Sequence, residues 1–427
     1  MDDGLSARKA EAAGSAIAKG LVGEAQPVAG FVDLDGLKAT IAALHASFPP
    51  HFMHAFAAKA GSILSLLRIV RDAGMGCEVA SPGELALARA AGFDPGRTVF
   101  DSPAKTRAEI ALALGSGMAL NIDSFQELER VDAWLAAHPD CRSVIGIRVN
   151  PQVGRGSIAA MSTATDTSKF GIGLEDAGNR QRLLAAYRDR PWLTAIHAHV
   201  GSQGCPLELI GRGLARTVEL AREIDAAAGR PQIGTVDIGG GLPVNFAGDE
   251  MMPSFADYAA VLRDFVPALF TGAFRVVTEL GRSVLAKNGF ILARVEYTKT
   301  MGGLPIAITH AGAQVATRTV FMPDLWPIRI SALDPQGRPK AGPKVEQDIA
   351  GPCCFAGDII AHRRALPLLE PDDWILAHDT GAYYFSTPFI YNSLPVVAVH
   401  GFEGEEGGLA FEILRDCVAD LQISGKS

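Results

Sequence analysis

The sequence predicts a (β/α)8 TIM-like barrel followed by a C-terminal, mostly β domain. Between about residues 30 and 284, eight short apolar runs alternate with longer stretches of helical periodicity. This span has the length of about 250 residues that eight strand–helix units need. After Arg282 the apolar runs continue without helices between them, and glycine and proline turns separate them.

The elements follow in order along the chain. The expected barrel strands cover residues 51–59, 76–80, 98–101, 118–122, 143–150, 193–200, 234–239 and 274–280. Helices are expected between most of them, including 63–73, 82–91, 104–114, 125–136 and 207–228. In the second domain, strands are expected at 290–297, 305–308, 374–377 and 396–399.

These elements divide the chain into three parts. Residues 1–27, rich in Ala and Gly, form a lead-in that is either a helix or loose chain. Residues 28–284 form the barrel, and residues 285–427 form the β domain. A strand near residues 26–33 is a candidate member of the second domain.

Composition excludes several classes of partner. Among 427 residues the net charge is −8, without a basic block, which argues against nucleic acid or an anionic membrane as partner. The acidic N-terminus and the absence of an uncharged apolar run of membrane-spanning length predict a cytoplasmic enzyme. The six cysteines follow neither a disulfide framework nor a zinc pattern, so we expect reduced thiols and no metal.

Polar residues gather where the expected barrel strands end, which is where such barrels build active sites. Lys59 ends the first strand, and similar polar groups end the sixth, seventh and eighth strands, at residues 197–203, 237–241 and 279–283. Three consecutive glycines, Gly239–Gly241, let backbone N–H groups approach an anion such as phosphate. A lysine in a low-dielectric pocket can form a Schiff base, and lysine plus phosphate site together suggest pyridoxal phosphate. His199 would then cover the cofactor ring, and Glu279 would meet its pyridine nitrogen.

Each of these signals has a simpler interpretation. A lysine at a strand end is most often a solvated edge charge, and three glycines are more often a flexible turn. One of His197 and His199 is expected to be an ordinary core histidine, and Arg282 could pair with a surface acid. The functional interpretation is favoured because all the signals fall at the same end of successive strands.

Other phosphate and metal chemistries fit less well. The stretch after Asp237 is not the GxGxxG fingerprint, because a proline follows where a helix should open. The terminal Gly-Lys-Ser lacks the upstream glycine and strand of a P-loop, so a nucleotide enzyme is disfavoured. A metal-dependent barrel hydrolase is disfavoured because His and Asp ligands do not cluster at the strand ends.

The chain resembles, over about residues 28–415, the fold type III pyridoxal-phosphate amino-acid decarboxylases, which include diaminopimelate and ornithine decarboxylases and share the alanine racemase-like fold. Residues 56–60 look like the family's FAxKAN element, 199–203 like HxGSQ, 237–241 like its phosphate loop and 279–282 like EPGR; residues 148–151 and 168–171 also match. The resemblance implies that Lys59 forms the Schiff base, that His199 stacks on the ring and that Glu279 meets the pyridine nitrogen. It also implies the remaining cofactor contacts, namely Ser202, Gly239, Gly240, Gly241, Gly281 and Arg282, with Arg282 reaching either the phosphate side or the substrate.

The second domain carries two further motifs of this family. Residues 351–358 are similar to GPxCExxD, which puts Cys354 at the catalytic cysteine that reprotonates the substrate carbon. Residues 381–383 resemble GAY, whose tyrosine, here Tyr383, touches the phosphate. Because the cysteine segment of this family enters the neighbouring subunit, the resemblance implies a homodimer with shared active sites.

The sequence differs from the family at the positions that contact the substrate. Phe355 replaces the acidic residue that pairs with the substrate's distal ammonium, and an apolar ring cannot compensate that charge. Residues 322–331, aligned with MNDLxRPALY, place Pro327 and Ser331 where an arginine and a tyrosine bind the distal carboxylate. Asp358 and Asp324 remain as acidic candidates for substrate contact. We therefore expect decarboxylation of an amino acid with a neutral, apolar or acylated far end, rather than of meso-diaminopimelate.

Three alternatives to this hypothesis stay open. The first is diaminopimelate decarboxylase proper. The second is an alanine-racemase-like racemase, which would need a tyrosine base from the β domain. The third is a non-catalytic regulator that binds pyridoxal phosphate, and the retention of Lys59, Glu279, Cys354 and Tyr383 disfavours it.

Overall fold

The computed structural model describes residues 5–418 of the chain. The chain divides into two compact units. We call residues 40–244 and 252–283 the barrel unit, and residues 1–39, 245–251 and 284–427 the β unit. The β unit is thus assembled from three separate stretches of sequence.

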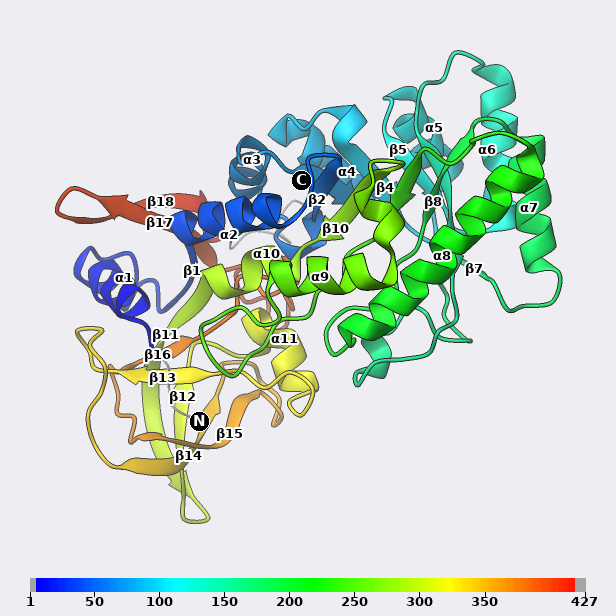
Figure 1. Cartoon of the computed structure of the whole chain (residues 1–427). Helices are drawn as coiled ribbons and strands as arrows, with labels where there is room; N and C mark the ends of the chain where they lie inside the picture. The colour runs from blue at the N-terminus through cyan, green and yellow to red at the C-terminus, as the bar shows by residue number, and fades with distance from the viewer. Residues whose placement is uncertain (1–4, 419–427) are drawn as a thin grey trace, which may run out of the picture. The chain divides into compact units, whose positions relative to one another are not determined.

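Eight parallel strands close the barrel unit, and the expected fold class is confirmed (Figure 1). Along the chain, each of these eight strands pairs with the next one, and the eighth pairs with the first. A short additional strand, β7 (Ile172–Gly173), pairs with β6. The eight strands are β2 (Phe52–Ala57), β3 (Gly76–Val79), β4 (Thr98–Asp101), β5 (Ala119–Ile122), β6 (Ile145–Asn150), β8 (Leu193–His197), β9 (Thr235–Asp237) and β10 (Arg275–Leu280).

Helices connect these strands, and local sequence starts several of them. The hydroxyls of Ser81, Thr106 and Ser124 each accept the N–H of the third following residue, which caps the helix that begins there. The α-helices are α2 (Leu34–Ser47), α3 (Leu64–Asp72), α4 (Pro82–Ala91), α5 (Arg107–Gly115), α6 (Phe125–Ala137), α7 (Asn179–Asp189), α8 (Leu207–Ala228) and α9 (Phe255–Phe265). Short 3-10 turns are η1 (Ala58–Ala60), η2 (Pro95–Arg97), η3 (Ala159–Met161) and η4 (Pro267–Phe270).

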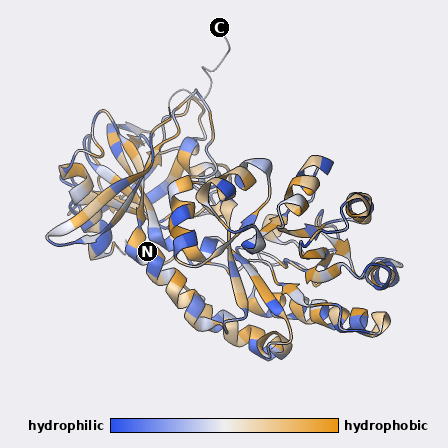
Figure 2. Cartoon of the chain, turned by 90° about the horizontal axis from the view of Figure 1, so that it is seen from above, coloured by the Kyte–Doolittle hydropathy of each residue, from blue (hydrophilic) through white to orange (hydrophobic). Residues whose placement is uncertain are grey.

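The strands are apolar because they are covered on both faces. All residues of β2 and β6 are buried, as expected for parallel strands under a layer of helices. Figure 2 shows apolar residues along the barrel strands and alternating polar and apolar residues along the helices. Charged residues within such strands are therefore exceptional.

The β unit is built on a nine-stranded sheet with α1 (Ala7–Ala18), α10 (Arg282–Leu285), η5 (Ala286–Asn288) and α11 (Ala313–Phe321) in the neighbouring chain segments. β1 (Val28–Asp33) is central: it pairs antiparallel with β11 (Gly289–Met301) and parallel with β17 (Ala398–Glu405). The remaining strands are β12 (Leu304–Thr309), β13 (Ile330–Leu333), β14 (Lys344–Ala350), β15 (Ile359–Pro367), β16 (Trp374–Ala377) and β18 (Gly408–Arg415).

The lead-in is a helix rather than loose chain. Ser6 caps α1, and Ala12, Ala13 and Ala16 bury its apolar face in the core of the β unit against residues such as Trp374. No helix within residues 5–418 is long and apolar enough to cross a membrane.

β2 and β8 end before the expected residues 59 and 200, so Lys59 and His199 lie beyond their strands. β2 ends at Ala57, and Lys59 lies in η1, which the hydrogen bond from the Gly61 N–H to the Ala58 carbonyl closes. β8 ends at His197, so His199 lies beyond the strand. The backbone that follows each strand therefore sets the directions of the Lys59 and His199 side chains. The alternation of side chains along the strand does not.

Candidate active site

The polar side chains of the barrel unit lie where its strands finish. Lys59 directly follows β2, and Asp101, His197 and Asp237 are the last residues of β4, β8 and β9. Glu279 is the last residue but one of β10. Because the eight strands are parallel, their carboxyl ends share one rim of the barrel, which is the active-site rim of this fold.

Lys59 is ion-paired with a carboxylate that the sequence analysis missed. Its Nζ lies 2.5 Å from Oε2 of Glu78, on the neighbouring strand β3. Glu78 is fully buried, whereas 43% of the Lys59 side chain is exposed. Burial raises the pKa of Glu78, and the Lys59 ammonium opposes that shift. The amine is thus held in place and remains accessible. An acidic residue inside a fully buried strand was the available signal.

His199 packs against the glycine loop with a neutral ring. The N–H of Gly240 donates to Nδ1 of His199 over 3.1 Å, which leaves the ring proton on Nε2. Burial lowers the pKa of His199 to about 3, with help from the cations Arg148 and His197. A neutral, oriented imidazole is suited to lie against a planar cofactor.

The glycine loop, Gly239–Gly241, accepts only residues without a Cβ. Gly239 and Gly241 have φ angles of +65° and +109°. A Cβ on Gly240 would lie 2.1 Å from the Glu279 carbonyl oxygen, and one on Gly241 would lie 2.1 Å from that of Gly201. The loop is therefore packed backbone to backbone, so that a ligand can approach it closely, while the N–H groups of Gly239 and Gly240 donate to Asp237 and His199.

Glu279 carries an unsatisfied oxygen inside this site. The residue is 5% exposed, and its Oε1 has no hydrogen-bond partner among residues 5–418. Burial and the neighbouring Asp237 raise the pKa of Glu279 well above its usual value. A buried carboxyl oxygen without a partner is the group that a pyridine nitrogen would satisfy. Together with the glycine loop, it shows that these residues fit pyridoxal phosphate.

Gly281 and Arg282 continue the chain from β10 past the lysine. A Cβ on Gly281 would lie 2.8 Å from that of Ala60, the residue after Lys59. Arg282 is 5% exposed and begins α10. Ser202, the other expected phosphate contact, donates its N–H to the Met161 carbonyl over 2.9 Å. The turn after β10 therefore runs close to the turn that holds Lys59.

An ion-pair network joins the strand ends behind these residues. Arg148 lies 2.7 Å from Asp101, and Nδ1 of His197 lies 3.3 Å from Asp237. Asn121 donates to Asp237 over 3.0 Å. Burial raises the pKa of Asp101, but Arg148 and His197 more than offset this and lower it. The two aspartates are thus held ionised in the barrel interior.

The β unit holds the expected cysteine on an exposed segment. Cys354 is exposed, and its N–H donates to Oδ1 of Asn392 over 2.7 Å. Its neighbour Cys353 is buried, and burial raises the pKa of the Cys353 thiol to about 11. Only one thiol of the pair faces outward.

The two acidic candidates for substrate contact lie in different environments. Asp358 is 3% exposed, and its two carboxylate oxygens accept the N–H groups of Ala313 and Cys353, each over 2.6 Å. It therefore ties the start of α11 to the cysteine segment. Asp324 lies on the exposed surface of the unit.

Phe355 belongs to a group of four rings that we call the aromatic cluster: Phe321, Phe355, Phe389 and Tyr391. Phe355 stacks on Phe321 with ring centres 5.6 Å apart and meets Tyr391 edge-on at 5.5 Å. Phe389 contacts both Phe321 and Tyr391. The side chain that replaces the family's acidic residue is therefore part of an apolar surface beside Cys354.

The segment aligned with MNDLxRPALY enters the core of the β unit. Ser331 is in β13, is 2% exposed and bonds with Nε2 of His378 over 2.8 Å. Arg329 is also buried and ion-paired with Asp249 and Asp379. Pro327 is exposed between two buried residues, Trp326 and Ile328. Ser331 therefore fills a structural position in this sheet.

Arg318, on α11, is a cation that the sequence analysis missed. Its guanidinium carbon lies 4.8 Å from the ring centre of Tyr383 and 5.2 Å from that of Trp326. Within residues 5–418 it forms no ion pair with a carboxylate. Tyr383, the expected phosphate contact, has a φ of +69°. Phe321 follows Arg318 by three residues, so both lie on one face of α11.

Comparison with known proteins places this arrangement in a family. The model for "pyridoxal-dependent decarboxylase, pyridoxal binding domain" matches residues 34–286. The diaminopimelate decarboxylase of Pseudomonas aeruginosa is 34% identical over 360 residues, which cover 84% of this chain and 82% of that protein. The solved diaminopimelate decarboxylase of Helicobacter pylori, complexed with L-lysine, superposes with a TM-score of 0.79 at 26% identity and covers 92% of this chain and 94% of that one.

A lysine/ornithine decarboxylase from Vibrio vulnificus, complexed with putrescine, shares the fold with a TM-score of 0.76 at 20% identity over 93% of this chain and 99% of that one. The family match spans the whole barrel rim described above, from the strand before Lys59 to the turn after Arg282. This chain therefore belongs to the pyridoxal-dependent decarboxylases, enzymes whose cofactor is pyridoxal phosphate.

Proposed function

We propose that this decarboxylase acts on an amino acid whose far end carries no free ammonium group. The observation that supports the proposal is the position of Phe355 in the aromatic cluster beside Cys354. An ammonium group would lose its hydration there without gaining a carboxylate, which costs several kcal/mol. Arg318, one turn of helix away from Phe321, would repel it further.

In the barrel unit, the contacts of Lys59, His199 and Glu279 support the following proposed roles. Lys59, oriented by Glu78, would hold the cofactor covalently through its amine. The neutral ring of His199 would cover the cofactor, and Glu279 would bind its nitrogen through Oε1. The glycine loop, Ser202 and Arg282 would hold the phosphate side. Once bound, pyridoxal phosphate supplies an electron sink for the pair that departing carbon dioxide leaves behind.

Cys354 would return a proton to the substrate carbon after carbon dioxide has left. Its exposed segment is held by Asn392 and by the Tyr391 hydroxyl, which donates to the Cys354 carbonyl over 3.4 Å. These bonds fix the backbone and leave the thiol unrestrained by them. A positioned general acid contributes roughly 10²- to 10⁴-fold to rate.

The far end of the substrate would meet the aromatic cluster and Arg318. The rings suit an apolar or acylated chain, and a guanidinium without a carboxylate partner among the described residues suits a substrate carboxylate. We therefore infer an amino acid whose distal amine is acylated, with a carboxylate on the acyl group as the preferred form.

Diaminopimelate itself is the second candidate. The observation that favours it is the name of the relatives, which are diaminopimelate decarboxylases at 34% and 31% identity. Its distal carboxylate would also find Arg318, but its distal ammonium would lie against Phe355. The two candidates therefore differ in whether that amine is free and in which part of the molecule carries the distal carboxylate.

We propose further that the enzyme works as a homodimer. Large apolar side chains are exposed next to Cys354, among them Phe321 at 53%, Ile390 at 45% and Tyr391 at 37%. Exposed apolar patches of this kind mark interaction surfaces. A second copy that covers the patch would also receive Cys354. Mixing Lys59→Ala with Cys354→Ala subunits should then give more activity than either variant alone, whereas no gain in mixed dimers would contradict the shared site.

Carbon dioxide release from paired substrates tests the substrate proposal. Lysine and diaminopimelate would each be compared with their forms succinylated at the distal amine, using protein whose cofactor content is known from its absorbance. We expect the succinylated member of each pair to react faster, and Arg318→Gln to reduce that preference while Arg318→Lys retains part of it. Faster release from free diaminopimelate would overturn the proposal and support the second candidate.

A further inference from the structure

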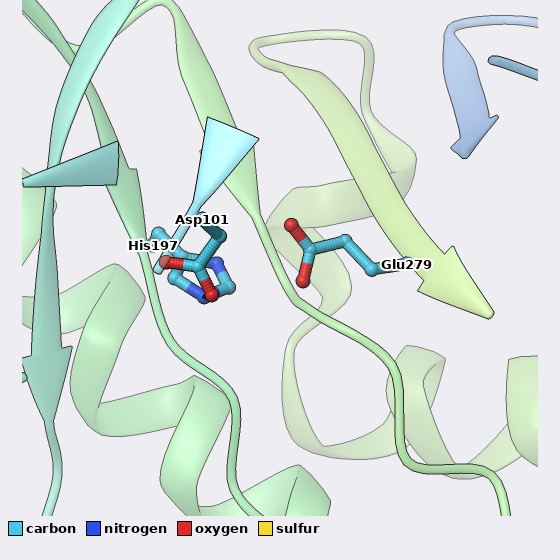
Figure 3. Close-up of side chains that lie close together, drawn as sticks. All are labelled: Asp101, His197 and Glu279. Atoms are coloured by element: carbon cyan, nitrogen blue, oxygen red, sulfur yellow. Dashed lines mark ion pairs between the residues drawn. The ribbon is translucent and has the colours of Figure 1, made fainter. Parts of the chain in front are cut away.

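The barrel unit buries a second histidine at the centre of the site. His197 is fully buried at the end of β8. Its Nδ1 lies 3.3 Å from Asp237 Oδ1, and its Nε2 lies 3.5 Å from Asp101 Oδ2. One ligand atom from each of Asp101, His197 and Glu279 lies within 4.8 Å of the other two. Figure 3 shows the Glu279 carboxyl pointing toward the other two side chains. The imidazole is thus flanked by carboxyl groups from three strands.

The strand register explains this meeting. In the barrel, His197 pairs opposite Asp237 on β9 and opposite Arg148 on β6. Arg148 is already paired with Asp101. Asp237 has no cationic partner other than His197 among residues 5–418. If Asp101 and Asp237 are both ionised, Arg148 neutralises Asp101, and His197 must carry a positive charge to neutralise Asp237.

The charges around the ring favour its protonated form. Burial lowers the pKa of His197, but Asp237, Glu279 and Asp101 outweigh burial and raise it well above the usual value. Burial likewise raises the pKa of Asp237, and His197 lowers it again. Arg148, which pairs opposite His197 on β6, is itself ion-paired with Asp101. The geometry and the charges thus agree on an imidazolium.

We propose that His197 is a positioning residue, an imidazolium that lets Asp101, Asp237 and Glu279 share the centre of the barrel and keeps Glu279 aimed at the cofactor nitrogen. The proposal rests on the role proposed above for Glu279. Asp237 also accepts the N–H of Gly239 over 3.0 Å, so the same charge balance supports the first residue of the glycine loop. Loss of the imidazolium would leave two buried carboxylates with one cation, and would weaken both the nitrogen contact and the phosphate loop.

Histidine-labelled NMR of the cofactor-free protein tests the charge directly. The chain has 10 histidines, and His54, His199 and His378 have pKa values lowered to about 3. We expect one ring signal of the imidazolium form to persist at pH 8 and to vanish in His197→Gln. A spectrum at pH 8 without an imidazolium signal would overturn the proposal. Because this readout needs no cofactor and no substrate, it is independent of the proposed function.

Cofactor binding tests the positioning role. We expect His197→Gln to raise the dissociation constant for pyridoxal phosphate, followed by absorbance, at least about tenfold, equivalent to ~1.4 kcal/mol. The double variant His197→Gln/Asp101→Asn removes one charge of each sign and should recover part of that loss, with Asp101→Asn alone as the control. Equal loss in the double variant would mean that His197 acts only by packing, which contradicts the proposal.

The double variant also covers the case in which His197→Gln does not fold, because its interior charge is balanced again. In that case the double variant should fold. Its dissociation constant for pyridoxal phosphate should exceed that of the natural chain by less than the tenfold expected for the single variant. Absence of carbon dioxide release from the natural chain, with the cofactor bound normally, would instead count against the proposed function and leave the role of His197 intact.

Discussion

Nζ of Lys59 lies 2.5 Å from Oε2 of Glu78, although Lys59 lies in η1 after β2 and Glu78 lies in β3. The parallel pairing of β2 with β3 creates this contact, because Ala57 lies opposite Glu78 and Lys59 follows in the next turn. The carboxylate is buried while the lysine chain is half exposed. The ion pair thus holds the flexible Lys59 amine in one position before the cofactor binds.

Glu78→Gln should slow the loading of the cofactor. Without the charged partner, the exposed Lys59 side chain samples more rotamers, and we expect the visible band of the bound cofactor to form about tenfold more slowly, equivalent to ~1.4 kcal/mol. Stopped-flow absorbance measures this rate. Glu78→Asp, which retains the charge with a shorter reach, serves as the control and should be intermediate. An unchanged rate in Glu78→Gln would refute the orienting role.

Gly240→Ala should impair the phosphate site. The new Cβ would lie 2.1 Å from the Glu279 carbonyl oxygen, so the loop must move and take the Glu279 backbone with it. Overpacking of this kind costs roughly 1–3 kcal/mol of unfolding free energy. We also expect cofactor affinity to fall at least about tenfold. Gly234→Ala is the matched control, because nothing lies within 4 Å of its Cβ. Equal behaviour of the two variants would contradict the packing argument.

Cys354→Ala should slow product formation by roughly 10²-fold or more, because the general acid is lost. Part of the substrate should then be diverted to the carbonyl product of transamination, which mass spectrometry of the products detects. Cys353→Ala is the internal control, since that thiol is buried and its pKa is raised to about 11. If Cys354→Ala keeps the rate and the product profile of the natural chain, the proton comes from another group.

Phe355→Glu should create activity on a diamino acid. The carboxylate would give the distal ammonium of diaminopimelate or lysine a partner in place of the aromatic ring. We expect kcat/KM for these substrates to rise roughly tenfold or more, equivalent to about 1.4 kcal/mol. Phe355→Gln has nearly the same shape without the charge and should show little gain. A Phe355→Glu enzyme with no gain at any substrate concentration would place Phe355 outside the substrate pocket.

His54 makes the barrel unit sensitive to acid. Burial lowers the pKa of His54 to about 3, and its Nδ1 is hydrogen-bonded to the Thr278 hydroxyl over 2.9 Å. Below about pH 6.5, the usual pKa of histidine, His54 is protonated in the unfolded chain but stays neutral in the folded chain. The free energy of unfolding should therefore decrease by about 2 kcal/mol between pH 7 and pH 5 on account of this group. Urea denaturation of His54→Gln should show a shallower pH dependence over that range, and an identical slope would exclude His54 as a cause.

The sequence predicts the barrel well because its strands are short, buried on both faces and separated by helices with their own start signals. It predicts the second sheet poorly. β14 and β15 mix buried and exposed residues, with Arg363 and Arg364 in the middle of β15, and they have no continuous apolar run to reveal them. β14 and β15 pair with each other, and β14 also pairs with β12, but their mixed composition gives the local pattern little to show.

The same distinction applies to the site. Lys59, His199 and the glycine loop stand in motifs that can be read locally. The Glu78 and Asp101 contacts depend on which charged strand residues meet after the barrel closes. That pairing register cannot be derived from the local pattern of a single sequence. Asp358 shows a different limit: its motif makes it a candidate for substrate contact, whereas only the structure reveals that its oxygens accept two backbone N–H groups.

The central position of β1 also sets the order of events during synthesis. Its two partners begin at residues 289 and 398, long after residue 33 has left the ribosome. At about 5–20 residues per second, β1 waits on the order of ten seconds or more with both edges unpaired. The barrel strands pair mostly with their neighbours in sequence and can close during that interval. A nascent chain stalled before residue 289 should therefore be a substrate for chaperones that bind exposed strands, and release from them should coincide with the emergence of β17.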